Sequence, residues 1–208
     1  MPGILAKKLG MTQLFMEDGK VERVTVLEAG PCPVTAVRTR ERDGYDAVQL
    51  GFGQVKERRL SKPELGHLKK AGASPVRHLV EFRDHEGTES EHKIGDTVTV
   101  EDFEVGAKVK ISGITKGKGF QGTIKRHGFK SGPKSHGSHN VRAPGSIGAS
   151  AYPARVFKGI RGPGQMGNVR ATQRGLEVVR IDSDKHLLLV RGSVPGPRGG
   201  VVEVRTDA

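Results

Sequence analysis

A glycine-rich segment at residues 117–122 has the composition of a nucleotide-binding loop. It reads Gly-Lys-Gly-Phe-Gln-Gly, which matches the GxGxxG pattern of dinucleotide-binding proteins, and a strand expected at Lys108 to Ile111 precedes it. That pattern also requires an acidic residue about 20 positions further on, to bind a ribose hydroxyl. None occurs before Glu177, and no Gly-Lys-Ser or Gly-Lys-Thr forms a phosphate loop. We therefore expect no cofactor, although glycines of this kind let a backbone approach a phosphate closely.

Three histidines of the same region have side chains that could bind a metal ion: His127, His136 and His139. No Cys, Asp or Glu lies near them in the sequence to complete a set of ligands, and the local positive charge opposes binding of a cation. We predict no metal site, and expect these imidazoles to donate to phosphate or stack on bases. Four aromatic rings could stack in the same way: Phe120, Phe129, Tyr152 and Phe157. For Phe120 and Phe157 a second role is equally open, as anchors of a loop on the rest of the fold.

The charge of the chain is concentrated in one segment. No Asp or Glu occurs among the 72 residues between Glu104 and Glu177, which contain 14 Lys and Arg and 15 of the 30 glycines. The other 136 residues contain 21 Lys and Arg against 23 Asp and Glu, so the net charge of +12 comes entirely from this window. Unpaired like charges repel one another, and glycine makes ordering of the backbone entropically costly. The window therefore predicts a polyanionic partner whose phosphates neutralise it.

The candidate RNA-binding side chains are basic, polar or aromatic residues of this window. They are Lys116, Lys118, Lys125, Arg126, His127, Lys130, Lys134, His136, His139, Arg142, Ser150, Tyr152, Arg155, Lys158, Arg161, Gln165, Arg170 and Arg174. On a surface of balanced charge such cations would be solvated, but the lack of counter-charge here favours contact with phosphate. Solvation is expected instead for basic residues that have acidic neighbours or lie on an exposed helix, namely Lys56, Arg58, Arg59, Lys69 and Lys70.

Short β-like runs separated by turn signals fill the first hundred residues, a pattern typical of a barrel or sandwich. Strands are expected at 11–16, 21–28, 34–40, 45–52, 79–83 and 97–100. The dipeptides Asp18-Gly19, Asp43-Gly44 and Glu86-Gly87 are expected to close hairpins, since glycine adopts positive φ at little cost. One short helix is expected at 62–71, with a capping box formed by Ser61 and Glu64 and with Gly72 at its end. The fold class is therefore mainly β.

Regular periodicity fades between residues 128 and 154 and resumes at 176. Strands expected at 176–181 and 186–190 flank Asp182 to Lys185 as a hairpin, and 201–205 forms a last strand. We predict a β-barrel body made of residues 1–112 and 176–208, with the helical insertion at about 61–72. A long loop at 113–175, with its tip at about 142–153, interrupts this body. Loops longer than about 12–15 residues are usually functional or disordered, and the charge of this one favours function.

The remaining features exclude several classes of protein. No apolar run approaches the roughly 20 residues of a membrane span, and residues 1–11 lack the apolar stretch of a signal peptide, so we expect a cytosolic protein. The single cysteine, Cys32, lies between two prolines and is expected to be a small buried residue rather than a reactive thiol. No GxSxG motif or other local nucleophile arrangement occurs, so we expect no enzyme.

Several segments together resemble the large ribosomal subunit protein L-three family in its bacterial form. The resemblance covers nearly the whole chain: residues 4–15 resemble the family's opening, and residues 103–126 carry its signature, centred on Thr115 to Gly122. Further matches lie at 144–148, 156–159, 164–168 and 187–196. Two positions depart from the family pattern. Lys110 stands where Asp or Asn is usual, and Ala151 occupies the place of a glutamine that some members carry methylated.

The resemblance implies a translation-factor-like β-barrel body and an extension that runs through ribosomal RNA towards the peptidyl-transferase centre. It also implies an early role in subunit assembly. The implied partners are large-subunit (23S) rRNA and the neighbouring proteins L-fourteen, L-nineteen and L-thirteen. Within this interpretation the RNA does the chemistry, and the protein is structural.

Two alternatives stay open at the level of sequence. A general nucleic-acid-binding or DNA-compacting protein would use the same charges, but on a structured face rather than in a long glycine-rich loop. An enzyme acting on RNA would need paired acids or a metal near the basic surface. Glu104 and Glu177 flank the window and could meet in space.

Overall fold

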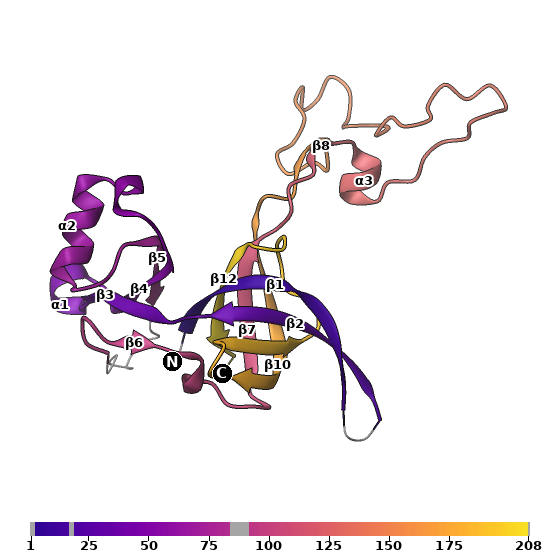
Figure 1. Cartoon of the computed structure of the whole chain (residues 1–208). Coiled ribbons are helices and arrows are strands. Elements are labelled where there is room, and N and C mark those ends of the chain that lie inside the picture. Colours follow the sequence, from indigo (N-terminus) through magenta and orange to yellow (C-terminus); the bar gives the residue numbers. More distant parts are fainter. Residues whose placement is uncertain (1–2, 17–18, 84–91, 208) are drawn as a thin grey trace. The chain divides into compact units, whose positions relative to one another are not determined.

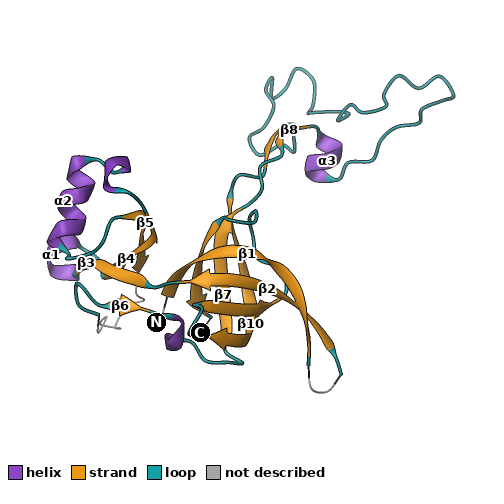
Figure 2. Ribbon diagram, viewed as in Figure 1, coloured by secondary structure: helices purple, strands orange, loops and turns teal. Residues whose placement is uncertain are grey.

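The computed structural model describes residues 3–16, 19–83 and 92–207, which form two compact units (Figures 1 and 2). We call Met1–Ile114 with Arg170–Ala208 the body, and Thr115–Val169 the basic unit. The predicted loop at 113–175 is longer than the basic unit at both ends, because residues 113–114 and 170–175 belong to strands of the body. The predicted turn at Glu86-Gly87 lies outside the described residues, as does Asp18 of the turn predicted at Asp18-Gly19.

The body contains a closed six-stranded barrel, which confirms the mainly β, barrel-containing fold that the sequence predicts. All of its strand pairs are antiparallel. Around the barrel the order is β1 (Gly3–Phe15), β12 (Val201–Thr206), β7 (Lys108–Ile114), β10 (Arg170–Asp182), β11 (Leu187–Arg191) and β2 (Val21–Ala29). The hairpin β10–β11 pairs on one side with β7 and on the other with β2, so it completes the sheet as predicted.

A second, four-stranded sheet is inserted between β2 and β7. Its order is β5 (Val76–Arg83), β4 (Ala47–Gln54), β3 (Cys32–Arg38) and β6 (Thr97–Val98). Among the described residues, four helical segments accompany it: α1 (Arg40–Asp43), η1 (Glu57–Arg59), α2 (Lys62–Lys70) and η2 (Val100–Asp102). The strand predicted to reach residue 40 ends at Arg38. The following turn of helix ends at Gly44, whose φ is +82°, so a helical turn rather than a tight two-residue turn connects β3 to β4.

Helix α2 confirms the predicted helix and its capping box. The Ser61 backbone N–H donates to Glu64 Oε2 at 2.8 Å, and the Ser61 hydroxyl donates to the same carboxylate oxygen. These hydrogen bonds stabilise the charged carboxylate and therefore lower the pKa of Glu64. Pro63 occupies the first turn, where its missing N–H has no partner in the helix to lose.

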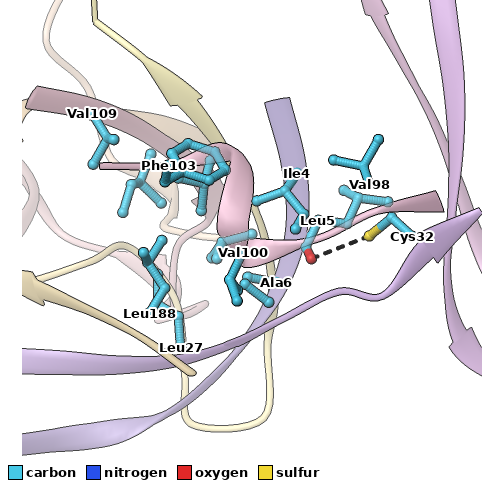
Figure 3. Packing of buried hydrophobic residues seen from close by; sticks show 14 of the residues in the cluster. Ile4, Leu5, Ala6, Leu27, Cys32, Val98, Val100, Phe103, Val109 and Leu188 are labelled. Atoms are coloured by element: carbon cyan, nitrogen blue, oxygen red, sulfur yellow. Dashed lines mark hydrogen bonds between the residues drawn. The ribbon is translucent and has the colours of Figure 1, made fainter. Parts of the chain in front are cut away.

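One continuous hydrophobic core runs from the barrel into the four-stranded sheet (Figure 3). On β1, Ile4, Leu5 and Ala6 are buried in succession, because both faces of this strand are covered. The first half of β1 is not predicted from the sequence, because a strand buried on both faces shows no alternation of apolar and polar residues. Elsewhere alternation holds, as for Val109 and Ile111 on β7. Fully burying a side chain of this size stabilises the fold by roughly 1.5–3 kcal/mol relative to exposure.

The single cysteine is part of this core. Cys32 is fully buried at the start of β3, and its thiol donates to the Leu5 carbonyl oxygen at 3.5 Å (Figure 3). Burial raises the pKa of the Cys32 thiol to about 12, because the thiolate would lose its hydration. The thiol is therefore unreactive at neutral pH, as the sequence predicts.

Within the described part of the chain, no helix is both long and apolar enough to cross a membrane.

Candidate nucleic-acid interface

A short two-stranded ribbon forms the base of the basic unit. Strands β8 (Gly119–Gln121) and β9 (Gly164–Met166) pair antiparallel, with Phe120 opposite Gln165. Further backbone hydrogen bonds continue the ribbon towards both ends of the unit. The Lys118 N–H donates to the Met166 carbonyl at 2.8 Å, and the Thr115 N–H donates to the Val169 carbonyl at 2.9 Å. The basic unit thus begins and ends in hydrogen-bonded, regular structure.

The segment that matches GxGxxG lies in this ribbon and not in a dinucleotide-binding motif. That motif requires a parallel βαβ unit, whereas all strand pairs among the described residues are antiparallel. The helix after it, α3 (Thr123–His127), has only five residues and leads into irregular chain rather than into a parallel strand.

Gly167 makes the ribbon possible. Its φ is +71°, and a Cβ atom at this position would lie 2.1 Å from the Lys116 carbonyl oxygen. Both the conformation and the close approach therefore require glycine. No local pattern predicts this requirement for glycine, because the opposing backbone lies about fifty positions earlier in the chain.

Two predicted phosphate-binding residues instead help to close the unit on itself. Arg126 Nη1 donates to the Gly162 carbonyl oxygen at 2.7 Å, and His127 Nε2 lies 3.0 Å from the same oxygen. Both side chains are only partly exposed. These contacts hold α3 against the chain that enters β9, so Arg126 and His127 position their neighbours whether or not they also reach a phosphate.

The basic unit has no hydrophobic core of its own. Among residues 115–169 the only buried side chain is that of Thr123, and no apolar side chain is buried. Phe120 is 76% exposed, Tyr152 89% and Phe157 60%. The exposure of Phe120 and Phe157 within this unit leaves their rings free to stack on bases. Their alternative role, as anchors of the loop on the rest of the fold, stays a prediction. The Arg155 guanidinium lies over the Phe157 ring, 5.6 Å from its centroid.

The cations of the basic unit have no acidic partner within the unit. Residues 115–169 contain ten Lys and Arg and no Asp or Glu. Fourteen of the predicted site residues are exposed there, namely Lys116, Lys118, Lys125, Lys130, Lys134, His136, His139, Arg142, Ser150, Tyr152, Arg155, Lys158, Arg161 and Gln165. The structure therefore gathers most of the predicted side chains in one unit, whose charged side chains are all cationic. Such a surface raises the local concentration of anions.

Arg170 and Arg174 differ from the other predicted residues, because they lie in the body and not in the basic unit. Both lie on β10 of the body, and both have acidic partners: Arg170 forms an ion pair with Glu203, and Arg174 donates to Asp207 at 3.0 Å. The assumption that they lack counter-charge is therefore wrong. These acids lie about 33 residues later in the sequence, and only the barrel brings them into contact.

The acidic and metal-ligating side chains bear on the alternative of an enzyme that acts on RNA. Among the described residues, no group of three or more His, Cys, Asp and Glu side chains is placed to hold a metal ion. Glu177, one of the two acids that flank the window, forms an ion pair with Arg191 at 3.2 Å on the outside of the barrel.

One polar residue that was not predicted to be buried is Lys8, which lies inside the fold on β1 and donates to the Val194 carbonyl oxygen at 2.6 Å. It has a structural position in the barrel.

The fold and the site together define a class of protein in which an antiparallel barrel is combined with a core-free unit whose charged side chains are all cationic. Comparison with known proteins assigns the family. The family model of ribosomal protein L3 matches residues 69–187, more than half of the chain. The chain therefore belongs to the ribosomal protein L3 family, and it is a structural component of the large ribosomal subunit rather than an enzyme.

Curated relatives agree over nearly the full length. The chain is 54% identical over 204 residues to the large ribosomal subunit protein uL3 of Synechococcus sp., a match that covers 97% of this chain and 94% of that protein. The proteins of the same name from Prochlorococcus marinus and Herpetosiphon aurantiacus are 53% and 52% identical, each over 99% of this chain and over 94% and 96% of their own lengths. Membership of this family places the chain in the cytoplasmic ribosome.

The ribbon geometry predicts that Gly167→Ala disrupts the base of the basic unit. The added Cβ would meet the Lys116 carbonyl, and alanine disfavours a φ of +71°. We expect the amide protons of Thr115 and Lys118 to lose protection in hydrogen exchange, while core amides of the barrel keep theirs. Gly122→Ala is the matched control, because φ is −71° there and no atom lies within 4 Å of the added carbon. Unchanged protection of both amides in Gly167→Ala would contradict this account of the ribbon.

The ion pair between Arg174 on β10 and Asp207 predicts a lowered pKa for the Asp207 carboxyl. Hydrogen bonds from Arg174 and from the Gly175 N–H lower the pKa of Asp207. This pair therefore stabilises the fold above the carboxyl's unfolded pKa, and its contribution is lost as pH falls through the lower folded pKa. NMR titration of the Asp207 carboxyl should show a midpoint below the usual value, and Arg174→Gln should raise that midpoint. Arg180→Gln, on the same strand, should leave it in place. Equal midpoints in wild type and Arg174→Gln would exclude Arg174 as the cause.

Proposed function

We propose that the chain binds large-subunit (23S) rRNA through the basic unit, with the body fixing where that unit starts and ends. The observation that carries this proposal is the combination of ten Lys and Arg, no acid and no buried apolar side chain in residues 115–169. A segment of this kind gains little from folding alone, since it buries no core and its charges repel one another. Contact with RNA would supply both the counter-charge and the packing surface that it lacks.

Three kinds of contact follow from the residues present. Exposed Lys and Arg side chains neutralise phosphates and release counterions, which gives affinity without sequence preference. Exposed rings such as Phe120 and Tyr152 can stack on unpaired bases. The glycines permit the backbone to pass close to RNA strands, where bulky side chains would not fit.

The family resemblance supports a more specific version of this proposal. In it the segment at about 142–153 is the tip of an extension directed towards the peptidyl-transferase centre, and the protein takes part early in assembly of the subunit. Its protein neighbours would be L-fourteen, L-nineteen and L-thirteen. The catalytic chemistry of that centre belongs to RNA in this version, and the protein contributes shape and charge.

Removing three charges from the ribbon and α3 should weaken binding in a salt-dependent way. The variant combines Lys116→Gln, Lys118→Gln and Lys125→Gln. We expect the slope of log affinity against log salt concentration to become smaller in magnitude by about two to three, since each phosphate contact contributes roughly 0.7 to 0.9 to that slope. The measurement is a salt titration of binding to a large-subunit rRNA transcript, repeated with duplex DNA of random sequence.

The control for this experiment is the triple variant Lys56→Gln, Arg58→Gln and Arg59→Gln. It removes the same charge from exposed positions in and next to η1 of the body and should leave the slope near that of the wild type. A similar loss in both triple variants would indicate a general effect of net charge and would contradict a specific interface. Equal affinity for rRNA and for random duplex DNA would favour the general nucleic-acid-binding alternative.

Deletion of residues 131–154 should separate folding from binding. The hydrophobic core lies entirely in the body, so we expect the urea midpoint of the body to stay near that of the wild type while affinity for the rRNA transcript falls. Circular dichroism and urea unfolding measure the first property, and a binding titration measures the second. Collapse of the barrel signal on deletion would show that this segment is part of the folding core, and the two-unit account would be wrong.

A further inference from the structure

A cleft of about 430 Å³ lies on the outer surface of the body, lined by residues of β5 and of the barrel strands β7, β10 and β12. It lies outside the acid-free basic unit, in the part of the chain whose charges nearly balance. Its lining nevertheless includes four cations, Arg83, Lys110, Arg170 and Arg205, against a single acid. A local surplus of positive charge on an otherwise balanced body calls for an explanation.

Strand register produces this surplus. On β7, Val109 and Ile111 point into the barrel core, so Lys110 and Ser112 point outwards. Lys110 is opposite Arg205 on β12. On the other side, Ser112 is opposite Thr172 on β10, and their hydroxyl oxygens are 2.7 Å apart. Three adjacent strands thus present two cations and a pair of hydroxyl groups side by side.

The acids around the cleft are already occupied. The Glu81 carboxylate accepts hydrogen bonds from the Tyr45 hydroxyl at 2.8 Å and from Arg38 at 3.3 Å. Glu203, on the same outer face of β12, forms ion pairs with Arg170 and Arg205. The carboxylates of Glu81 and Glu203 therefore both have partners already.

In the described part of the chain, two of the lining cations form no such ion pair, although Lys110 lies close enough to Asp207 to contribute to the lowered pKa of that carboxyl. Within the described residues, neither Arg83 nor Lys110 forms an ion pair. The Arg83 guanidinium lies over the Tyr45 ring, 4.5 Å from its centroid, which fixes the side chain without neutralising it. The cleft therefore presents an exposed guanidinium, a half-buried ammonium and a hydrogen-bonded pair of hydroxyl groups, one of which keeps its proton free to donate.

We propose that this cleft binds a phosphate group of the RNA backbone and so forms a second RNA contact, located on the body. The proposal rests on the proposed function, and it adds a site whose residues lie outside the basic unit. A phosphodiester presents closely spaced oxygens that accept both from cations and from hydroxyl donors, which are the groups gathered here. The volume of the cleft lies within the range of sites that hold a nucleotide-sized ligand.

The test compares two double variants of the full-length chain that remove the same charge from the same two strands. The cleft variant is Arg83→Gln with Lys110→Gln, and the control is Arg77→Gln with Lys108→Gln, which changes one arginine on β5 and one lysine on β7 outside the cleft. We expect the cleft variant to bind a large-subunit rRNA transcript roughly tenfold more weakly at 0.1 M salt, with a salt slope lower by about 1.5. The control should bind like the wild type, and Lys110→Arg, which keeps the charge, should retain the affinity.

Comparison with the basic-unit triple variant at Lys116, Lys118 and Lys125 separates the two proposals. If that variant loses affinity and the cleft variant does not, the cleft proposal is overturned and the proposed function stands. If the cleft variant and its control weaken binding equally, the cleft has no special role and the proposal also fails. If neither the triple variant nor the cleft variant changes affinity, both proposals fail. Urea unfolding of each variant verifies that the body is folded.

Discussion

The antiparallel pairing of β7 with β10 is the constraint on which both units depend. It closes the six-stranded barrel, and it places Ile114 opposite Arg170 although a 55-residue unit separates them in sequence. Bringing together the ends of so long a segment costs conformational entropy that grows slowly with its length. The basic unit cannot repay this cost, because it buries no apolar side chain. The core of the body must therefore do so, and the ends of the basic unit are fixed by a sheet to which it contributes no strand.

The same pairing divides the charge of the chain more sharply than the sequence does. The acid-free window contains 14 Lys and Arg, but four of them, Lys108, Lys110, Arg170 and Arg174, lie on β7 and β10. The basic unit keeps ten cations and no acid, while the body holds the other 25 against all 23 Asp and Glu. On the barrel, acids from β12 and the residue that follows it reach Arg170 and Arg174. A stretch of sequence without acidic residues can therefore still have acidic side chains beside it on the folded surface.

Local patterns predicted much of the fold because most elements here follow local rules. The capping box before α2, the hairpin β10–β11 and the alternation along β7 each depend on residues only a few positions apart. The first half of β1 escaped prediction because burial on both faces removes alternation. The closing contacts of the basic unit escaped it because the Gly162 carbonyl and the Lys116 carbonyl meet partners that lie 35 to 51 positions away.

The sequence by itself determined the class of fold, the location of the uncompensated charge and the family, since each depends on composition and on short motifs in a fixed order. Only the tertiary structure decided which of the marked cations are exposed, which are paired and which hold the chain in place. Arg126, Arg161 and Arg174 are equivalent in the sequence, yet one is bound to a backbone carbonyl, one is exposed in the basic unit and one is paired with Asp207. The physical reason is that electrostatic partners are chosen by distance in space, which strand register and backbone closure set.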